Sequence, residues 1–317
     1  MPLFISIDRS LIMNKLQANL CLLCVTFCWS TEVIIFACIP DQVSPFATTS
    51  ITFLIGGGIL FLAFSGRILS GLKKEGRKQL LYCLFLSMLN SAYNTMYQFG
   101  LKNFDVSTGA FTLSLTVVAL PIIMIIRRSQ VDKKTWLSSA IVLAGISAAL
   151  SGVLTADQLP GLAIICAGCV LRAFYIIKLN QYAKKYDPIT LSALICISGG
   201  LISYLFWLGV QPGTFLALNW SSTVIASLAI YAYFVVAFTI TLNLFAQRRA
   251  SPAGATIIYS MEIVFSVIWG AVMPANLIDP ISITPRLVAG MICVVAGNLV
   301  EILDFNKLRR KRLEAEA

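Results

Sequence analysis

Long apolar runs dominate the pattern of hydrophobic and polar positions along the chain. Most are close to the roughly 20 residues that an α-helix needs to cross the hydrocarbon core of a bilayer. Short stretches of turn-forming or charged residues separate them, such as Lys184–Pro188 and Gln211-Pro212-Gly213. The pattern predicts ten membrane-spanning helices, over residues 18–39, 45–65, 79–99, 107–126, 134–154, 159–179, 188–208, 222–244, 254–273 and 285–304.

The composition agrees with this interpretation and excludes other classes of protein. Of the 317 residues, 58% are hydrophobic and 12% are charged, whereas a soluble domain has about 25% charged residues. A water-soluble enzyme is therefore excluded, and so is a disordered chain, which needs low hydrophobicity and high charge. A membrane β-barrel would show short alternating segments. The first run is too long for a signal-peptide core, so we expect it to be retained as a helix.

Basic residues predict which side of the membrane each loop faces. If the chain crosses ten times, all but three of its 24 Lys and Arg residues fall on one side. The exceptions are Lys102 and Arg286 on the other side, and Arg172 within a span. Because cytoplasmic loops carry the excess of Lys and Arg, both termini are expected to be cytoplasmic. The net charge of +10 is then explained by the basic cytoplasmic loops, and no nucleic-acid partner is expected. The expected location is the bacterial cytoplasmic membrane.

The chain also repeats itself. The matched positions are Pro45 and Pro188, Gly56-Gly57 and Gly199-Gly200, Ser107 and Ser251, and Gly145 and Gly297. Their offset is 143 for the first two pairs, then 144 and 152. Five helices in each half would place the halves in opposite orientations, which makes an inverted repeat like that of many secondary transporters. The predicted fold is therefore an all-α integral membrane protein with a cytoplasmic segment 1–17, five-helix repeats 18–155 and 159–304, and a basic cytoplasmic tail 305–317.

Three short motifs add a family resemblance. They are Trp29-Ser30 in the first predicted helix, Ser251-Pro252-Ala253 with Met261-Glu262-Ile263 in the ninth, and Leu287–Gly297 in the tenth. With the spans and the duplication, they resemble the ten-helix EamA-type exporters of the drug/metabolite transporter superfamily over nearly the whole chain. The resemblance implies a transporter that moves a small solute outward.

The sequence also departs from the pattern of that family. Ile263 replaces an expected proline, and Arg172 stands where the second repeat often has tryptophan. Arg127-Arg128 and Pro274-Ala275 stand where the family usually has glutamate. These departures leave the identity of the solute open.

Three ionisable residues stand out among those within predicted spans, where a charge costs about 2.5–3.5 kcal/mol on insertion scales and usually faces a cavity or a partner. They are Glu32, Arg172 and Glu262. At 1.5 Å per residue, Arg172 and Glu262 lie at matching depths of roughly 10–12 Å from the cytoplasmic face, and Glu32 lies about 9 Å further out. We therefore expect Arg172 to pair with Glu262 in preference to Glu32. The alternatives are a purely structural ion pair, or an arginine that extends to the inner interface.

The third predicted helix carries a polar face. Asn90, Asn94 and Tyr97 follow i, i+4 and i+7, and Tyr93 lies beside them. Amides and tyrosines on one face suit a cavity that hydrogen-bonds a solute and stacks on its apolar part. The alternative is a set of contacts that hold helices together. Thr116 and Tyr259 are further candidates for the cavity lining.

These features favour a secondary-active exporter of a small metabolite, amino acid or drug-like solute that works by alternating access. A lipid flippase or scramblase of the same architecture is the alternative. An intramembrane enzyme would need catalytic groups such as paired aspartates or His with Ser, and the chain has no His.

No bound cofactor or metal is expected. The chain has no nucleotide-binding loop, so we expect no direct ATP coupling within it, and no ATPase subunit is implied. The nine Cys all fall in predicted spans, so no disulfide framework is implied. Without His, coupling to protons would have to use a carboxylate, and Glu32 is the best placed. The expected partners are a solute and the lipid bilayer, while the oligomeric state is open.

Overall fold

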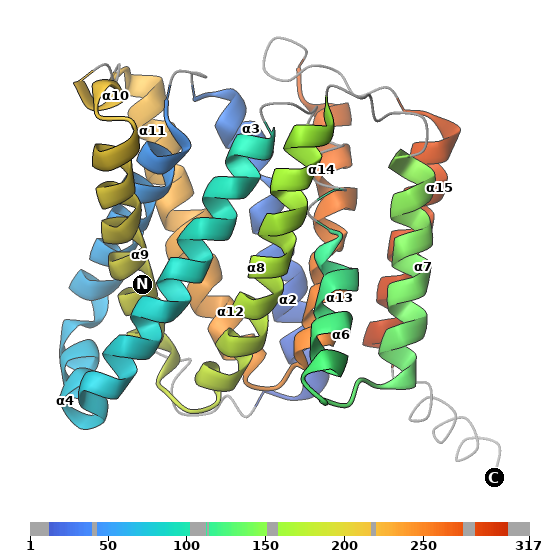
Figure 1. The fold of residues 1–317 in the computed structure, drawn as a ribbon, viewed down its shortest axis with the longest axis horizontal. Coiled ribbons are helices and arrows are strands. Elements are labelled where there is room, and N and C mark those ends of the chain that lie inside the picture. The colour runs from blue at the N-terminus through green and yellow to red at the C-terminus, as the bar shows by residue number, and fades with distance from the viewer. Residues whose placement is uncertain are drawn as a thin grey trace.

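The computed structural model describes residues 13–39, 43–101, 112, 114–150, 158–216, 220–274 and 283–303. Every regular element within these ranges is a helix, and the helices form an upright bundle (Figure 1). The first twelve residues, the basic tail 305–317 and most of residues 102–113 lie outside the described part of the chain.

The described part of the chain forms the following helices, in chain order. They are α2 (Lys15–Ser30), α3 (Glu32–Ala37), α4 (Pro45–Leu101), α6 (Thr116–Ile126), α7 (Lys133–Leu150), α8 (Leu159–Ala183), α9 (Pro188–Val210), α10 (Gly213–Leu216), α11 (Ser222–Ile230), η3 (Tyr231–Phe238), α12 (Thr239–Gln247), α13 (Pro252–Tyr259), α14 (Met261–Val272) and α15 (Pro285–Ile302).

Six helical segments in the described ranges are long and apolar enough to cross a membrane. They are Pro45–Gly100, Leu159–Ala183, Pro188–Val210, Ser222–Gln247, Pro252–Val272 and Pro285–Ile302, and Thr116–Ile126 is a shorter apolar helix. The first of them contains two of the predicted spans. The protein is therefore a multi-pass membrane protein, and its regular elements are all helices in the part of the chain that the structure describes. The total of ten spans and the cytoplasmic location of both termini stay predictions.

α4 differs from the predicted pair of helices over 45–65 and 79–99. Its first arm does not end at residue 65 but is kinked at Phe64 and continues to Gly76. There the chain turns back toward the opposite end of the bundle (Figure 1). Gly76 has a φ of 61°, a left-handed conformation that glycine adopts without steric cost. The chain therefore reverses its direction at Gly76, whereas the sequence pattern placed the end of the first helix at residue 65.

Three other predicted spans contain interruptions of the α-helix. Thr31 separates α2 from α3, Ser260 separates α13 from α14, and the π-helix η3 stands between α11 and α12. The hydroxyls of Thr31 and Ser260 donate to the carbonyls of Cys28 and Ile257 in their own helices, and such bonds bend helices. Interrupted helices are typical of binding sites in transporters.

The repeated glycines lie where helices of the two halves cross. A Cβ on Gly57 would lie 2.9 Å from the backbone nitrogen of Ile197, and one on Gly200 would lie 2.9 Å from that of Leu54. Adding 143 to the residue numbers of Gly57 and Leu54 gives Gly200 and Ile197, so the two contacts are reciprocal. A two-fold relation between the halves requires such contacts.

A second crossing shows the same reciprocity. A Cβ on Gly145 of α7 would lie 2.7 Å from the carbonyl oxygen of Gly290, and one on Gly297 of α15 would lie 3.0 Å from that of Ser138. Here an offset of 152 residues relates Gly145 to Gly297 and Ser138 to Gly290, so these two contacts are also reciprocal. The halves therefore meet at two close helix crossings, α4 with α9 and α7 with α15.

Candidate functional site

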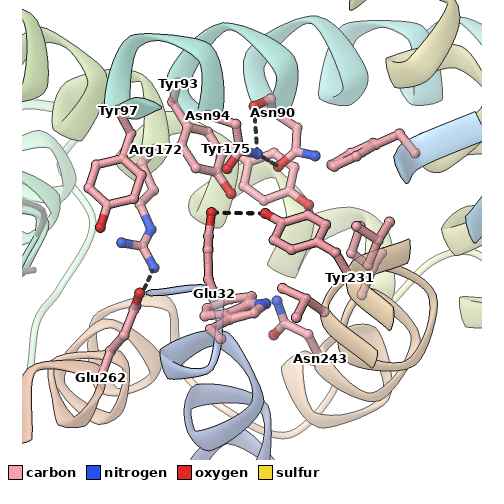
Figure 2. Close-up of a pocket in the computed structure, with 15 residues that line it drawn as sticks. Glu32, Asn90, Tyr93, Asn94, Tyr97, Arg172, Tyr175, Tyr231, Asn243 and Glu262 are labelled. Carbon is pink, nitrogen blue, oxygen red and sulfur yellow. Dashed lines mark hydrogen bonds and ion pairs between the residues drawn. The ribbon is translucent and has the colours of Figure 1, made fainter. Parts of the chain in front are cut away.

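A cavity lies between the two halves of the chain (Figure 2). Seven of its lining residues come before residue 100 and eight come after residue 170. They are Trp29, Glu32, Phe53, Asn90, Tyr93, Asn94, Tyr97, Arg172, Tyr175, Tyr231, Val235, Val236, Ile240, Asn243 and Glu262. The lining therefore combines ionisable side chains, amide side chains and aromatic rings.

The space open to the centres of water-sized spheres is about 50 Å³. A single water needs about 10–15 Å³ on this measure, so the cavity has room for a few water molecules. Pockets that enclose drug-sized ligands are larger. A metabolite would therefore fit only if the two halves moved apart.

Arg172 pairs with Glu262, as the matching depths predict. The Arg172 Nη2 atom lies 3.7 Å from Glu262 Oε2, and both side chains are almost fully buried. The distance is within reach of a charge pair but longer than a hydrogen bond. α8 supplies Arg172 from one side, and the first turn of α14 supplies Glu262 just after the break at Ser260.

Aromatic rings surround the Arg172 guanidinium. Its Cζ atom lies 5.6 Å from the ring centroid of Trp29, 5.9 Å from that of Tyr93 and 5.8 Å from that of Tyr259. Cation–π contacts at such distances contribute about 0.5–2 kcal/mol each, depending on desolvation. The rings therefore hold the cation in place although its contact with Glu262 is long.

Glu32 points into the same cavity from the interrupted helix α2–α3 (Figure 2). It is the first residue of α3, directly after the break at Thr31. The Tyr231 hydroxyl donates a hydrogen bond of 2.9 Å to Glu32 Oε1. Tyr231 begins the π-helix η3, which also supplies Val235 and Val236 to the cavity wall.

The amides of α4 form the upper edge of the cavity as Figure 2 is drawn. Asn94 Nδ2 donates to the backbone oxygen of Asn90 at 3.0 Å and to its side-chain oxygen at 3.3 Å. Asn90 Nδ2 is buried and has no hydrogen-bond partner. An unmade hydrogen bond at a buried donor costs about 1–3 kcal/mol, so a bound molecule with an acceptor atom would be favoured there.

A chain of hydrogen bonds runs from the end of α12 to the cavity. Asn180 Nδ2 donates to Gln247 Oε1 at 2.8 Å, and Gln247 Nε2 donates to the Tyr259 hydroxyl at 2.8 Å. Tyr259 then donates to Asn243 Oδ1 at 2.6 Å. The chain fixes the orientation of Tyr259 beside Arg172 and of Asn243 in the lining.

The structure gathers most of the residues that the sequence singled out. The cavity lining contains Glu32, Asn90, Tyr93, Asn94, Tyr97, Arg172 and Glu262. Tyr259 borders it through its contacts with Arg172 and Asn243. Thr116 does not line the cavity and lies against Cys169. The sequence pattern missed Tyr231, Tyr175 and Asn243, although the polar pair Asn243 and Gln247, spaced i, i+4, could have indicated a polar face on α12.

Comparisons with known proteins agree with this architecture. A model of the EamA-like transporter family matches residues 16–151 and again residues 159–300. No curated protein matches the chain. A crystal structure of another protein aligns with a TM-score of 0.71 and 18% sequence identity, covering 94% of this chain and 98% of the other. At that identity the likeness shows the fold alone.

Proposed function

Since the chain belongs to the EamA-like transporter family, we propose that it carries a small solute across the membrane through the cavity between its halves. The observation that carries the proposal is the composition of the lining. Both family-matched segments contribute to it in nearly equal number, and it holds three ionisable residues of the apolar helices, Glu32, Arg172 and Glu262. Secondary transporters place their binding sites at such repeat interfaces.

The proposed mechanism is alternating access. The halves rock against each other about the close glycine crossings, and the cavity faces each side of the membrane in turn. In the described state the cavity has room for only a few water molecules. Solute entry requires one side to widen. Outward transport is the proposed direction, in keeping with the resemblance to EamA-type exporters.

The charges of the lining limit the cargo. Two carboxyl groups face one guanidinium, so the site has an excess of negative charge when all three are ionised. A proton on Glu32 or an ammonium group of the solute would balance it. The aromatic wall would stack on an apolar part of the solute. A small metabolite, amino acid or drug-like molecule with these groups is the proposed substrate.

Glu32 is the proposed coupling residue because it combines a carboxyl group with an adjustable partner. Tyr231 donates to one of its oxygens, and a carboxylate has a second oxygen that can take a proton or bind a cation. Tyr231 stands on the π-helix of the second half, so a rocking motion that separates the halves would separate this pair. Proton binding and conformation would then be linked.

The test begins with growth of an overexpressing strain on a panel of amino acids, analogues and toxic compounds. A solute identified in this way is then followed in proteoliposomes with an imposed pH gradient. Glu32→Gln should lose gradient-driven accumulation by about tenfold or more, the loss expected if one charge-dependent step of about 1.4 kcal/mol is removed. Asn94→Ala and Tyr97→Ala should raise the solute concentration needed for half-maximal rate.

The matched control is Glu75→Gln, which removes a carboxylate from the turn of α4, outside the cavity lining. It should transport as wild type does. If Glu32→Gln responds to the gradient as wild type does, Glu32 does not couple transport to protons. If Asn94→Ala and Tyr97→Ala are also silent, the cavity is not the binding site. A fluorescent lipid in the same vesicles distinguishes a flippase, which would move the lipid and not the solute.

A further inference from the structure

The helix pair α4–α9 carries a polar contact at each of its ends. At one end, Arg67 Nη2 lies 2.6 Å from Asp187 Oδ1, and Arg67 Nε lies 3.2 and 3.3 Å from the two carboxylate oxygens. At the other end, the Ser44 hydroxyl donates to Gln211 Oε1. The close crossing of Gly57 with Gly200 lies between these contacts.

The two contacts occupy equivalent places in the repeat. Ser44 and Asp187 are 143 residues apart and each precedes the proline that opens its helix; Arg67 and Gln211 are 144 residues apart. Each contact joins the residue that precedes one helix to a residue 22 or 23 positions after the proline that opens the other. Exchange of the two halves therefore converts one contact into the other. The geometry is shared, but one contact is an ion pair and the other is a neutral hydrogen bond.

The contacts also lie on opposite sides of the membrane. From Ser44 to Arg67 the helical rise of 1.5 Å per residue spans about 34 Å, slightly more than the hydrocarbon thickness of about 30 Å. With the orientation predicted from the basic loops, Arg67–Asp187 lies at the cytoplasmic face. We call it the cytoplasmic closure and call Ser44–Gln211 the outer closure.

We propose that the cytoplasmic and outer closures open in alternation during transport, and that the ionic one holds the resting protein closed toward the cytoplasm. This inference rests on the proposed function. Helices that touch at one close crossing can separate at either end by pivoting about it, and each pivot breaks the contact at the end that opens. A charge-assisted bidentate pair is stronger than a neutral hydrogen bond, so the outer end opens first.

The chemistry of Asp187 supports this role. Partial burial alone would raise the pKa of its carboxyl group, but hydrogen bonds from Arg67 and Thr190 outweigh that effect and lower the pKa. The carboxylate is therefore charged at neutral pH. The side chains of Arg67 and Asp187 are 31% and 27% exposed, so dissolved salt can reach and weaken the pair.

The test is hydrogen–deuterium exchange of the full chain in lipid nanodiscs. Arg67→Gln removes the ion pair, while Asp187 still accepts a hydrogen bond from the backbone N–H of Thr190. Asp187→Asn removes the charge but keeps a residue that caps a helix well. Both should raise exchange about two- to fivefold at the start of α9, the shift expected when a partly exposed pair is lost. Both should also lower exchange at the end of α9 near Val210.

The opposite variant supplies the matched control. Ser44→Ala should raise exchange near Val210 and lower it at the start of α9. In wild type, 0.5 M salt should reproduce the effect of Arg67→Gln, and it should add nothing in that variant. Opposed changes at the two ends indicate exchange between two states, whereas fraying would raise exchange at one end alone.

Two results would overturn the proposal. One is a rise confined to the mutated end, and the other is no change at either end. The same variants in proteoliposomes separate this inference from the proposed function. If exchange changes in opposite directions at the two ends of α9 but no solute moves, the alternating closures are supported and the proposed transport function is wrong. If solute moves but exchange changes at one end only, the transport function is supported and the alternating closures are wrong.

Discussion

Replacing Arg172 with methionine should destabilise the fold by about 3–5 kcal/mol, because a buried carboxylate then loses its charge partner. Glu262 is almost fully buried, and Arg172 is the cation at ion-pair distance from it. The expected loss also includes the cation–π contacts with Trp29, Tyr93 and Tyr259. Thermal unfolding in detergent can be followed through the reaction of buried thiols, such as those of Cys83 and Cys196, with a maleimide dye.

The double variant Arg172→Met/Glu262→Met provides the control. Exchange of a whole buried ion pair for apolar side chains of similar volume is often neutral or stabilising. The double variant should therefore unfold at a higher temperature than Arg172→Met alone. Both variants should lose transport, which separates the role in the cavity from the role in stability. Equal destabilisation of the single and double variants would contradict a pairing of Arg172 with Glu262.

Arg172→Lys should fall between these variants. Lysine keeps the positive charge near Glu262, so the stability loss should be smaller than for methionine. Its compact ammonium lacks the planar face that packs among the aromatic rings. We therefore expect transport to be impaired more than stability.

Gly200→Ala should destabilise the protein by about 1–3 kcal/mol, the range for side chains forced into a packed contact. The new Cβ would lie 2.7 Å from Leu54 Cγ and 2.9 Å from the Leu54 backbone nitrogen. Because backbone lies on the other side, the strain cannot be relieved by a side-chain rotation. Gly57→Ala should have a similar effect, since its contact with Ile197 is the reciprocal one. Thermal unfolding in detergent measures both.

Two neighbouring glycines serve as controls. A Cβ on Gly58 of α4 or on Gly209 of α9 would meet no atom within 4 Å. Alanine at either position should leave the fold intact or stabilise it by up to about 1 kcal/mol, because alanine favours the helix more than glycine does. If Gly57→Ala or Gly200→Ala matched its neighbouring control, the crossing would not be the close contact on which the proposed rocking motion depends.

Much of the fold follows from local properties of the sequence. The apolar runs predict the helices because the length of a span depends on bilayer thickness, which does not vary with the neighbours of a helix. The duplication is visible because both halves need glycine where two backbones meet, as at Gly57 and Gly200. The motifs around Trp29 and Glu262 then led to the family, which the match to residues 16–151 and 159–300 confirms.

The interruptions of the helices were not predictable in the same way. Tyr231–Phe238 is apolar and reads as ordinary helix, yet the structure shows a π-helix there. The break at Thr31 depends on a hydroxyl that bonds to its own helix, an option that many membrane-helix Ser and Thr residues share without a break. Only the packing around each helix decides between these conformations.

The sequence by itself therefore determined the class of protein, the apolar segments that form its long helices, its duplication and the ionisable residues that had to find partners within the membrane. The matching depths of Arg172 and Glu262 even indicated one pair, because depth follows from the helical rise. The tertiary structure decided the rest. A span that is apolar on all sides has no face that identifies its neighbour, so the rotation of each helix is set by packing. That rotation brought Tyr231 to Glu32 across 199 residues and closed the cavity between the two halves.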